Sequence, residues 1–577
     1  MMGEVGASIP EDTEHAVSVS LPTWKANVGY EEGEEWVVSK MQTGYPRFFI
    51  HKSIKKLAAT ILSKYGRVGE DCMLFPSHSV ANRCRQFMKQ TSKSSPPPTL
   101  RILELVPRTK RETIISTGVS AVFFPAEEFK VAKQFWQHSG DGVSSRRAEY
   151  CSQELEEGLL VEKGALSEQF TRPAKGPKRY SRTAADVDFK PSSPPAPDAP
   201  DTSRFVEERF GRNLGVEFVG NAKLAIRRRI AGTLRSDVGL TDALALSREG
   251  GRDADLEEDD VYLCPSGMSA IFNSHRFLME ALGAKKSICY GFPYIDTLKI
   301  LEKFGPGAQF YGHGSQEDLD DLEKRLEGGE RFLALFCEFP GNPLLKSPDL
   351  LRIRKLADKY DFAVVVDETV GNFLNVHVLP HADIVVSSLT KVFSGDSNVM
   401  AGSLILNKKS SYYPVLKKLL EHEYEDNLWA EDALFLERNS RDFVSRIERI
   451  NVTAEAICEL LLKHPKIKAV YYPKHSPTKQ YYDNCRCPEG GYGGLLSMTF
   501  YSMEDAMKFF DEVETAKGPS LGTNFTLSSP YTLLAHYGEL DWAAQFGVES
   551  NLVRVSIGLE ETDKLVETFA RALKVLE

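Results

Sequence analysis

The sequence lacks the marks of a membrane-spanning, secreted or nucleic-acid-binding protein. No apolar run approaches the roughly 18 residues that a membrane span needs. The opening residues, MMGEVGASIPEDTEH, have no basic start and no apolar core, so we expect neither a secretory signal nor a transit peptide. Positive charge is not in excess, since 71 Lys and Arg residues face 81 Asp and Glu residues and the formal net charge is −10. Nucleic-acid binding needs a basic face, so we expect no such partner.

Cysteine and histidine are too scattered to predict a disulfide framework or a metal site. Nine cysteines are spread over 577 residues without framework spacing, which predicts reduced thiols in a cytoplasmic protein. Cys485 and Cys487 form one close pair, but no second pair follows at metal-binding spacing. His377 and His381 are four residues apart, but Pro380 between them disfavours a shared helical face. We therefore predict no metal site.

One internal stretch has almost no large apolar residues. Residues 171–203 contain seven prolines, and such a segment cannot bury enough surface to offset its ordering entropy. We predict a disordered linker there, and an N-terminal extension over residues 1–170 in which helical and mixed patterns both occur. The length of 577 residues predicts more than one domain, and 42% apolar with 26% charged residues is typical of a globular protein.

Beyond the linker, short apolar strands alternate with amphipathic helices. Runs such as FLALFCEFP, AVVVDET and IVVSS are separated by helical patterns such as DLLRIRKLADKY. Unbroken apolar strands that alternate with helices predict a mostly parallel sheet that is buried on both faces. We assign residues 204–412 to a large α/β domain. Residues 413–577, with longer polar helices and fewer strands, form a smaller α+β domain in this prediction.

A lysine follows directly on one of these strands, in the motif SSLTK at residues 387–391. Desolvation at a strand end would make the amine of Lys391 nucleophilic and suited to a Schiff base. Ser388 and Thr390 would then direct their hydroxyls at a phosphate. A solvated surface lysine is the more common outcome, because lysine is almost never buried. The pentapeptide alone therefore favours a surface loop.

Two further motifs stand next to strands. Asp367 ends the apolar run of VVVDET, where a carboxylate either pairs with a cation such as a pyridinium nitrogen or serves as a helix cap or structural ion pair. In PSGMSA, residues 265–270, the amides of Gly267 and Met268 open a helix and would form an anion site. Ser266 as a plain N-cap explains that motif equally. A glycine-opened helix, an acid and a lysine in this order match a fold-type I enzyme that uses pyridoxal phosphate (PLP).

The motifs, taken in order, also resemble a known family. SGMSAIF, YGFPY, CEFPGNP, VVVDET, SSLTKVFSGDSNVMAGSL, SLGTN and RVSIGLE are similar to motifs of the PLP-dependent enzymes of cysteine and methionine metabolism, over about residues 205–577. SLPTW, NVGYEEGE and GYPRFFIH resemble the N-terminal extension of the fungal cystathionine γ-synthase group. The resemblance implies a fold-type I transferase with PLP as its cofactor. The implied reaction condenses an O-acetyl- or O-succinylhomoserine with L-cysteine to give L-cystathionine, in transsulfuration and methionine biosynthesis.

The resemblance further implies roles for individual residues. Lys391 would bind PLP covalently and move protons, Asp367 would pair with the ring nitrogen, and Tyr290 would stack on the ring and act as an acid or base. The implied phosphate ligands are Gly267, Met268, Ser388, Thr390 and Arg212, the last one reaching into a neighbouring subunit. The implied substrate ligands are Arg554, which would grip the α-carboxylate, Asn342 and Ser520. A homodimer or homotetramer with the active site shared across a dimer is implied as well.

The sequence departs from the family pattern at two places. Phe210 stands where the family has Tyr, two residues before Arg212, and a Phe cannot donate a hydrogen bond worth roughly 1.5–3 kcal/mol to a phosphate. GFPY replaces a GGTY-like turn. Three alternatives stay open: a related PLP enzyme that uses another nucleophile on O-acetylhomoserine, a cystathionine or methionine lyase, and a catalytically silent protein with this fold.

Overall fold

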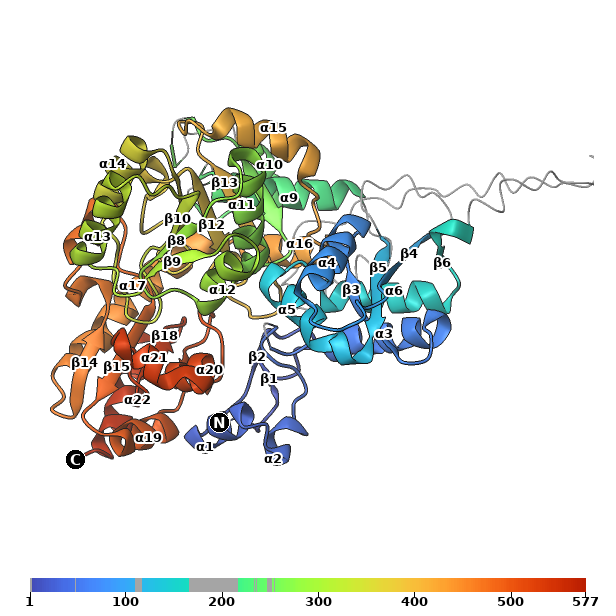
Figure 1. The fold of residues 1–577 in the computed structure, drawn as a ribbon. Helices are drawn as coiled ribbons and strands as arrows, with labels where there is room; N and C mark the ends of the chain where they lie inside the picture. Colours follow the sequence, from blue (N-terminus) through green and yellow to red (C-terminus); the bar gives the residue numbers. More distant parts are fainter. Residues whose placement is uncertain are drawn as a thin grey trace, which may run out of the picture.

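The computed structural model describes residues 3–46, 48–108, 117–165, 216–232, 234, 236–245, 252–253 and 255–577. The predicted linker at 171–203, together with Phe210 and Arg212, lies outside the described residues. The described chain forms sheets of four, seven and five strands and one two-stranded ribbon (Figure 1). Each of the three larger sheets organises one part of the molecule: the extension, the large domain and the small domain.

The large domain is built on the seven-stranded sheet. From one edge to the other, its strands are β7 (Val261–Cys264), β13 (Gly402–Leu406), β12 (Ile384–Ser388), β11 (Ala363–Asp367), β10 (Ala334–Glu338), β8 (Ser287–Tyr290) and β9 (Ala308–Tyr311). Parallel pairing joins β12, β11, β10, β8 and β9, whereas β13 pairs antiparallel with both β12 and β7. The predicted mostly parallel sheet is confirmed.

Both faces of this sheet are covered, because successive strand residues point into two different cores. Val365 of β11 packs in one core with helix α11 (Gly267–Leu282). Its neighbours Val364 and Val366 pack in the other core with helix α13 (Gln316–Glu327). This double burial explains why the strands are unbroken apolar runs in the sequence.

The small domain carries the five-stranded sheet. Its strand order is β14 (Ile467–Tyr471), β15 (Leu495–Phe500), β18 (Val553–Ser556), β17 (Leu527–Ser529) and β16 (Ala516–Lys517). Helices α17 (Phe443–Leu462), α19 (Met503–Glu512) and α22 (Thr562–Lys574) pack on it.

The chain crosses from the large to the small domain inside one helix. Phe443 and Ile447, in the first turns of α17, belong to a core of the large domain, whereas Ile450 and Ala454 belong to the small-domain core. Helix α15 (Tyr413–Glu423), which precedes it, packs on α11 of the large domain. The packing therefore places the crossing about 30 residues later than the predicted boundary at 412/413, since α17 is continuous across both cores.

The extension has two parts. A ribbon of β1 (Ser8–Ile9) and β2 (Ser18–Val19) leads into α1 (Trp24–Glu31) and α2 (Glu35–Val38). A four-stranded antiparallel sheet follows, in the order β3 (Glu70–Phe75), β5 (Val119–Pro125), β4 (Arg101–Pro107) and β6 (Leu160–Glu162). Its helices are α3 (Lys52–Tyr65), α4 (His78–Thr91), α5 (Phe129–Ser139) and α6 (Ser145–Glu156). The predicted α/β extension is thus present.

Aromatic contacts join the extension to both other domains. Helix α5 packs on α11 and on α12 (Ile295–Lys303) of the large domain, and α1 packs beside α19 of the small domain (Figure 1). The ring of Phe87 stacks on Phe304 at 4.7 Å between centroids, and Trp24 meets Phe510 edge-on at 6.0 Å. Buried aromatic rings dominate the energetics of such junctions. The extension is therefore part of one packed body with the large and small domains.

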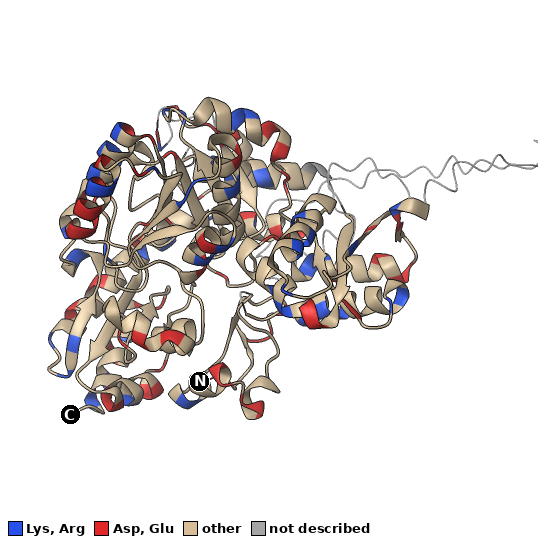
Figure 2. Cartoon of the chain, viewed as in Figure 1, with Lys and Arg blue, Asp and Glu red and all other residues tan. Residues whose placement is uncertain are grey.

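Charges of both signs are interspersed over the face shown in Figure 2. On helices α13 and α14 (Leu350–Tyr360) they form ion pairs, such as Arg352 with Asp320 at 2.6 Å. No helix among the described residues is both long enough and apolar enough to cross a membrane.

Candidate active site

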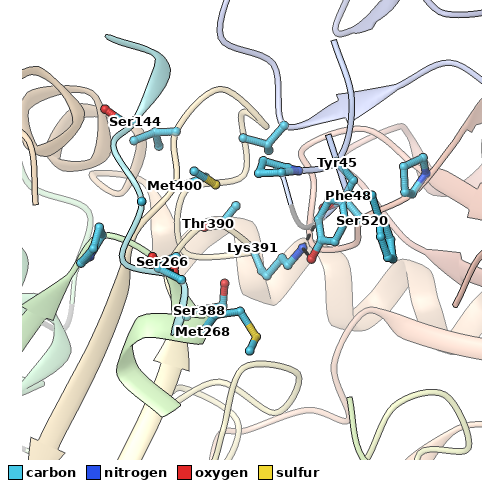
Figure 3. Close-up of a pocket in the computed structure, with 18 of the residues that line it drawn as sticks. Tyr45, Phe48, Ser144, Ser266, Met268, Ser388, Thr390, Lys391, Met400 and Ser520 are labelled. Atoms are coloured by element: carbon cyan, nitrogen blue, oxygen red, sulfur yellow. Dashed lines mark hydrogen bonds between the residues drawn. The ribbon is translucent and has the colours of Figure 1, made fainter. Parts of the chain in front are cut away.

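A cavity of about 220 Å³ lies where the three parts of the chain meet. The large domain contributes Lys391 and Asp367, the small domain Arg554, and the extension Tyr45 and Ser144. Figure 3 shows Lys391 pointing toward Tyr45 and Ser520, with Ser266, Met268 and Ser388 grouped on the other side of the lysine. The motifs singled out in the sequence, far apart along the chain, therefore converge on one cavity.

Lys391 lines this cavity and is buried, with 7% of its surface exposed. It follows β12, and its ammonium group donates to Ser520 Oγ at 2.8 Å and to Tyr45 Oη at 3.1 Å. The nitrogen also lies 4.7 Å from the centre of the Tyr45 ring. Among the described residues no carboxylate forms an ion pair with it. The structure excludes the surface-loop alternative, because burial and two long-range hydrogen bonds hold this lysine.

The start of α11 forms a cradle for an anion. Ser266 caps the helix by accepting from the amide of Ser269 at 3.1 Å, so the amides of Gly267 and Met268 lead the helix at its positive end. A Cβ atom at Gly267 would lie 2.6 Å from the Cβ of Ser388, so only glycine lets the helix begin this close to the end of β12. Gly267, Met268 and Ser388 all line the cavity. Helix amides and a hydroxyl at one point suit a phosphate.

Thr390 lines the same cavity, but its hydroxyl is engaged by the backbone. It accepts from the amide of Ala401 at 3.1 Å and donates to the Ala401 carbonyl at 3.2 Å. This pair of bonds fixes the turn that carries Lys391. The structure therefore places Thr390 at the predicted position and gives its hydroxyl a backbone partner.

Two half-buried carboxylates end adjacent strands at the cavity. Asp367, on β11, accepts from the amide of Thr369 at 2.8 Å, and burial raises its pKa to about 6. Glu338, on β10, accepts from the amides of Tyr294 and Asn342. Burial, with the charge of Asp367 second, raises its pKa to about 8. The described residues provide Asp367 with no cation. A cationic ring nitrogen in the cavity would therefore offset the cost of desolvating its negative charge.

Arg554 is the cation of the small domain, with 6% of its surface exposed. From β18 it donates to Asn342 Oδ1 at 3.0 Å and to the Ser520 carbonyl at 2.5 Å, and it lies over the Tyr531 ring. Burial lowers its pKa, and Tyr531, Tyr45 and Tyr294 act in the opposite direction. No carboxylate among the described residues pairs with it. A buried guanidinium of this kind suits a carboxylate ligand.

Ser520 joins the lysine to the arginine. Its backbone has a φ of 96°, in the left-handed region that favours glycine, so the residue is held under strain. The hydroxyl accepts from Lys391 and the carbonyl accepts from Arg554. This geometry fixes the distance between the amine and the guanidinium.

Tyr290 does not reach the cavity. It ends β8 in the core on the side of the sheet opposite α11, and its hydroxyl donates to the Ser315 carbonyl at 2.8 Å. Tyr294, four residues later at the start of α12, lines the cavity instead. The expected position of Tyr290 over the cofactor ring is therefore not what the structure shows, because the strand end turns this side chain to the far face.

A family model for Cys/Met metabolism PLP-dependent enzymes matches residues 254–574, which is more than half of the chain. The chain belongs to this family. A second model, for the N-terminal domain of fungal trans-sulfuration enzymes, matches residues 53–144. The cofactor of this PLP-dependent enzyme is pyridoxal phosphate. The cavity suits it, since an anion cradle, a half-buried carboxylate with no cationic partner among the described residues and a buried lysine surround one space.

Relatives of this PLP enzyme match it from end to end. A cystathionine gamma-synthase of Neurospora crassa is 53% identical and covers 100% of this chain and 98% of its own length. A cystathionine gamma-synthase of Saccharomyces cerevisiae is 42% identical and covers 99% of this chain and 98% of its own. A solved structure of cystathionine gamma synthase from Xanthomonas oryzae pv. oryzae is 21% identical, with a TM-score of 0.49 over 61% of this chain and 97% of that chain. The two sequence relatives span the extension as well.

The structure brings most predicted site residues of this PLP enzyme together. Those that line the cavity are Lys391, Asp367, Gly267, Met268, Ser388, Thr390, Asn342, Ser520 and Arg554. Their roles toward cofactor and substrate stay predictions. Tyr294, Glu338 and Tyr45 also line the cavity and were not predicted. A signal existed for Glu338, which ends an apolar strand as Asp367 does, whereas no spacing in the sequence connects Tyr45 to Lys391.

One group of possible metal ligands lies near the rim of the cavity. Among the described residues, Glu14, His15 and Glu149 bring three possible ligand atoms within 4.8 Å of one another. Both carboxylates are exposed, and the buried His15 already bonds to Ser145 Oγ at 2.9 Å. Burial lowers the pKa of His15 to about 2. Exposed acids often cluster in this way without an ion, so the absence of a metal site stays a prediction.

Proposed function

We propose that this enzyme condenses an O-acylated homoserine, acetylated or succinylated, with L-cysteine to give L-cystathionine. The Cγ–O bond of the acylhomoserine breaks, a Cγ–S bond to cysteine forms, and the acyl group leaves as a carboxylic acid that takes up the thiol proton. The two relatives named cystathionine gamma-synthase support this proposal, because both align with the chain over its whole length. The observation that carries it is that Ser520 contacts both a buried lysine, Lys391, and a buried arginine, Arg554, and so holds them side by side.

A lysine and an arginine held side by side suit an amino-acid substrate. Arg554 presents a desolvated guanidinium, and a carboxylate that binds it bidentately would fix the adjacent α-carbon near Lys391. Asn342 orients the arginine and contacts Tyr531 at 3.3 Å. Substrate binding in this pose places the α-proton within reach of a base. We assign that base to Lys391, which would remove the proton at Cα and later return protons to the carbon skeleton.

The remaining residues hold the cofactor. When bound, PLP supplies an electron sink that stabilises negative charge next to the α-carbon of an amino acid. Asp367 would keep the ring nitrogen protonated, and the α11 amides with Ser388 would hold the phosphate. Tyr294, from the start of α12, would face the ring in the place expected for Tyr290. Thr390 would act through the turn it fixes.

Assembly and compartment are further parts of the proposal. We propose a homodimer or homotetramer in which Arg212 of one subunit reaches the phosphate bound in the next. All nine cysteines are free, which supports a reducing compartment and hence the cytoplasm. Sedimentation of the holoenzyme, and the rate at which an Arg212→Ala variant loses PLP, would test the shared site.

The test of the reaction is a product assay with a matched lysine control. Purified enzyme loaded with PLP receives O-acetylhomoserine, or O-succinylhomoserine in parallel, together with L-cysteine, and cystathionine is quantified. We expect cystathionine from the wild type and from Lys418→Ala, which removes an exposed lysine of α15. Lys391→Ala should lose the activity. Acylhomoserine consumption without cystathionine, or breakdown of added cystathionine, would overturn the proposal in favour of another nucleophile or a lyase.

A further inference from the structure

We propose that Tyr45, a residue of the N-terminal extension, is a catalytic residue of this enzyme. Its hydroxyl would hold the amine of Lys391 through the proton transfers of the reaction. The inference rests on the proposed function, in which Lys391 is the base. It also assigns a chemical task to the extension, which lies outside the 254–574 segment that defines the family.

The first step of the argument is the contact itself. Tyr45 Oη lies 3.1 Å from Lys391 Nζ, and the ring of the same tyrosine lies below that nitrogen at 4.7 Å. Within the described residues the amine has two hydrogen-bond partners, the hydroxyls of Tyr45 and Ser520. The chain segment that precedes the linker therefore touches the reacting nitrogen directly.

The second step concerns the chemistry of the two partners. A hydroxyl accepts a hydrogen bond from an ammonium group and donates one to a neutral amine, whereas a carboxylate can only accept. A lysine that takes up and returns a proton changes between these two forms. Two hydroxyls keep the amine hydrogen-bonded in both forms, so its position is preserved while its proton moves. A carboxylate at the same place could accept from both forms but could not donate to the lone pair of the neutral amine.

The third step is that the backbone around Tyr45 is fixed. The amides of Phe48 and Phe49 both donate to the Tyr45 carbonyl, at 2.9 and 3.0 Å, which closes a tight turn. A Cβ at Gly44 would lie 2.6 Å from the Cβ of Phe49, so this turn requires glycine there. Two residues before Tyr45, the hydroxyl of Thr43 donates to the Ala16 carbonyl at 2.8 Å. The turn therefore presents the tyrosine to the cavity in a defined direction.

The fourth step links Tyr45 and Ser520 through the same junction. In the ribbon that precedes Tyr45, Ser18 Oγ donates to the Pro519 carbonyl at 2.6 Å, next to Ser520. The amide of Leu21 donates to the Lys517 carbonyl at 2.9 Å. The extension thus carries one hydroxyl partner of the lysine and anchors the loop that carries the other.

The experiment compares Tyr45→Phe with Tyr65→Phe in the full-length enzyme. The phenylalanine at 45 keeps the ring over the amine and removes only the hydroxyl. Tyr65, in the last turn of α3, does not line the cavity and serves as the matched control. One measurement is kcat and KM for cystathionine formation by the PLP-loaded enzyme. The other is the rate at which a small acylating reagent modifies Lys391 in the cofactor-free protein at pH 7.5, followed by mass spectrometry.

We expect Tyr45→Phe to lower kcat by about 10- to 100-fold, the range that loss of a hydrogen bond to a charged group predicts. KM should stay within about threefold, since the Tyr45 hydroxyl bonds to the lysine amine and does not bind the substrate carboxylate. Lys391 should be acylated several-fold faster, because its nitrogen loses one of the two hydroxyl partners that hold it and that a reagent must displace. Tyr65→Phe should match the wild type in kcat, in KM and in the acylation rate of Lys391.

Two results would overturn the inference: a kcat of Tyr45→Phe within twofold of the wild type, or an unchanged acylation rate of Lys391. Failure of the proposed function is a separate result. A wild type that binds PLP but forms no cystathionine would refute that function. The acylation rate, which needs neither cofactor nor substrate, would still show whether Tyr45 holds the amine.

Discussion

The two walls of the active-site cavity are built in different ways. One wall belongs to the catalytic domains, where Asp367 and Ser388 end neighbouring parallel strands and Lys391 follows at once. The other wall belongs to the extension, where Tyr45 stands in a turn between the β1–β2 ribbon and the four-stranded subdomain. The first wall is positioned by strand register and the second by docking of a separate sheet.

This difference predicts how each wall responds to change. Residues at strand ends are held by the sheet, so replacing one removes its chemistry and leaves its neighbours in place. Residues on the extension depend on a junction of aromatic packing and a few hydrogen bonds, such as Ser18 to Pro519. A change at that junction should displace several groups slightly. We therefore expect larger effects on activity from the first wall and more mixed effects on stability and rate from the second.

Replacement of Arg554 should have the largest effect. Removing one partner of a buried charge pair costs about 2–5 kcal/mol, so Arg554→Leu should lower kcat/KM for the acylhomoserine by about 30- to 5,000-fold. Arg554→Lys should recover part of the loss, because it keeps the charge without the two-pronged grip. Steady-state kinetics check this prediction. Arg571→Leu, which removes an exposed ion pair with Glu514, is the control. A loss below fivefold in Arg554→Leu would contradict a role in carboxylate binding.

Replacement of Asp367 should act on the cofactor. Asp367→Asn keeps the shape and removes the charge that would pair with the ring nitrogen, so the dissociation constant of PLP should rise by about 10- to 100-fold. Titration of the cofactor-free protein with PLP, followed by absorbance, measures this constant. The exposed Asp541→Asn provides the control. Equal PLP affinity in the two variants would show that the carboxylate does not meet the ring.

The strand-end wall was largely predictable from the sequence, because its signals are local. An apolar strand that ends in Asp367, and a lysine three residues beyond the Ser388 that ends the next strand, are visible without a structure. The sheet and its mostly parallel pairing follow from the same unbroken runs. Even here the burial of Lys391 could not be predicted from local sequence, since its two hydrogen-bond partners are 129 and 346 residues away along the chain.

The rest depended on directions and contacts that spacing does not reveal. Tyr290 and Tyr294 are four residues apart, and only the turn between β8 and α12 decides which one meets the cavity. Tyr45 belongs to the motif GYPRFFIH, and the resemblance of this motif to the fungal extension implied no role for any of its residues. The boundary between the catalytic domains could not be read either, because α17 is one continuous helix that enters two cores.

The junction of the second wall can be tested at Gly518. A Cβ there would lie 2.1 Å from the Val19 carbonyl oxygen, so Gly518→Ala must push the ribbon away from the loop that leads to Ser520. Such overpacking costs about 2 kcal/mol of unfolding free energy, and kcat should fall with it as Ser520 moves. Denaturant unfolding and kinetics measure both. Gly538→Ala, where no atom lies within 4 Å of the added carbon, should change neither. Identical behaviour of the two variants would mean that the ribbon yields freely.

The smallest expected effect is a pH dependence of stability that comes from the first wall alone. Burial raises the pKa of Glu338 to about 8, above the value of an unfolded chain, so the folded protein binds the extra proton. Stability from this group is fully present at low pH and is lost as pH rises toward about 8. In the cofactor-free protein, raising pH from 6 to 7 should lower the unfolding free energy by about 1 kcal/mol. Asp367, with a pKa of about 6, adds only about 0.3 kcal/mol over that interval, because it loses most of its proton near pH 6.

Glu338→Gln should remove most of this slope, because the amide does not titrate; its single oxygen keeps one of the two backbone hydrogen bonds, and its NH2 group cannot accept the other. Glu459→Gln, an exposed position on α17, should keep it. Urea unfolding at pH 6.0, 6.5 and 7.0 gives the comparison. An equal slope in all three proteins would place the titrating group elsewhere. If the pH dependence of the unfolding free energy is lost only in Glu338→Gln, the group that causes it is Glu338. The first wall then loses stability whenever this carboxyl is ionised next to Asp367.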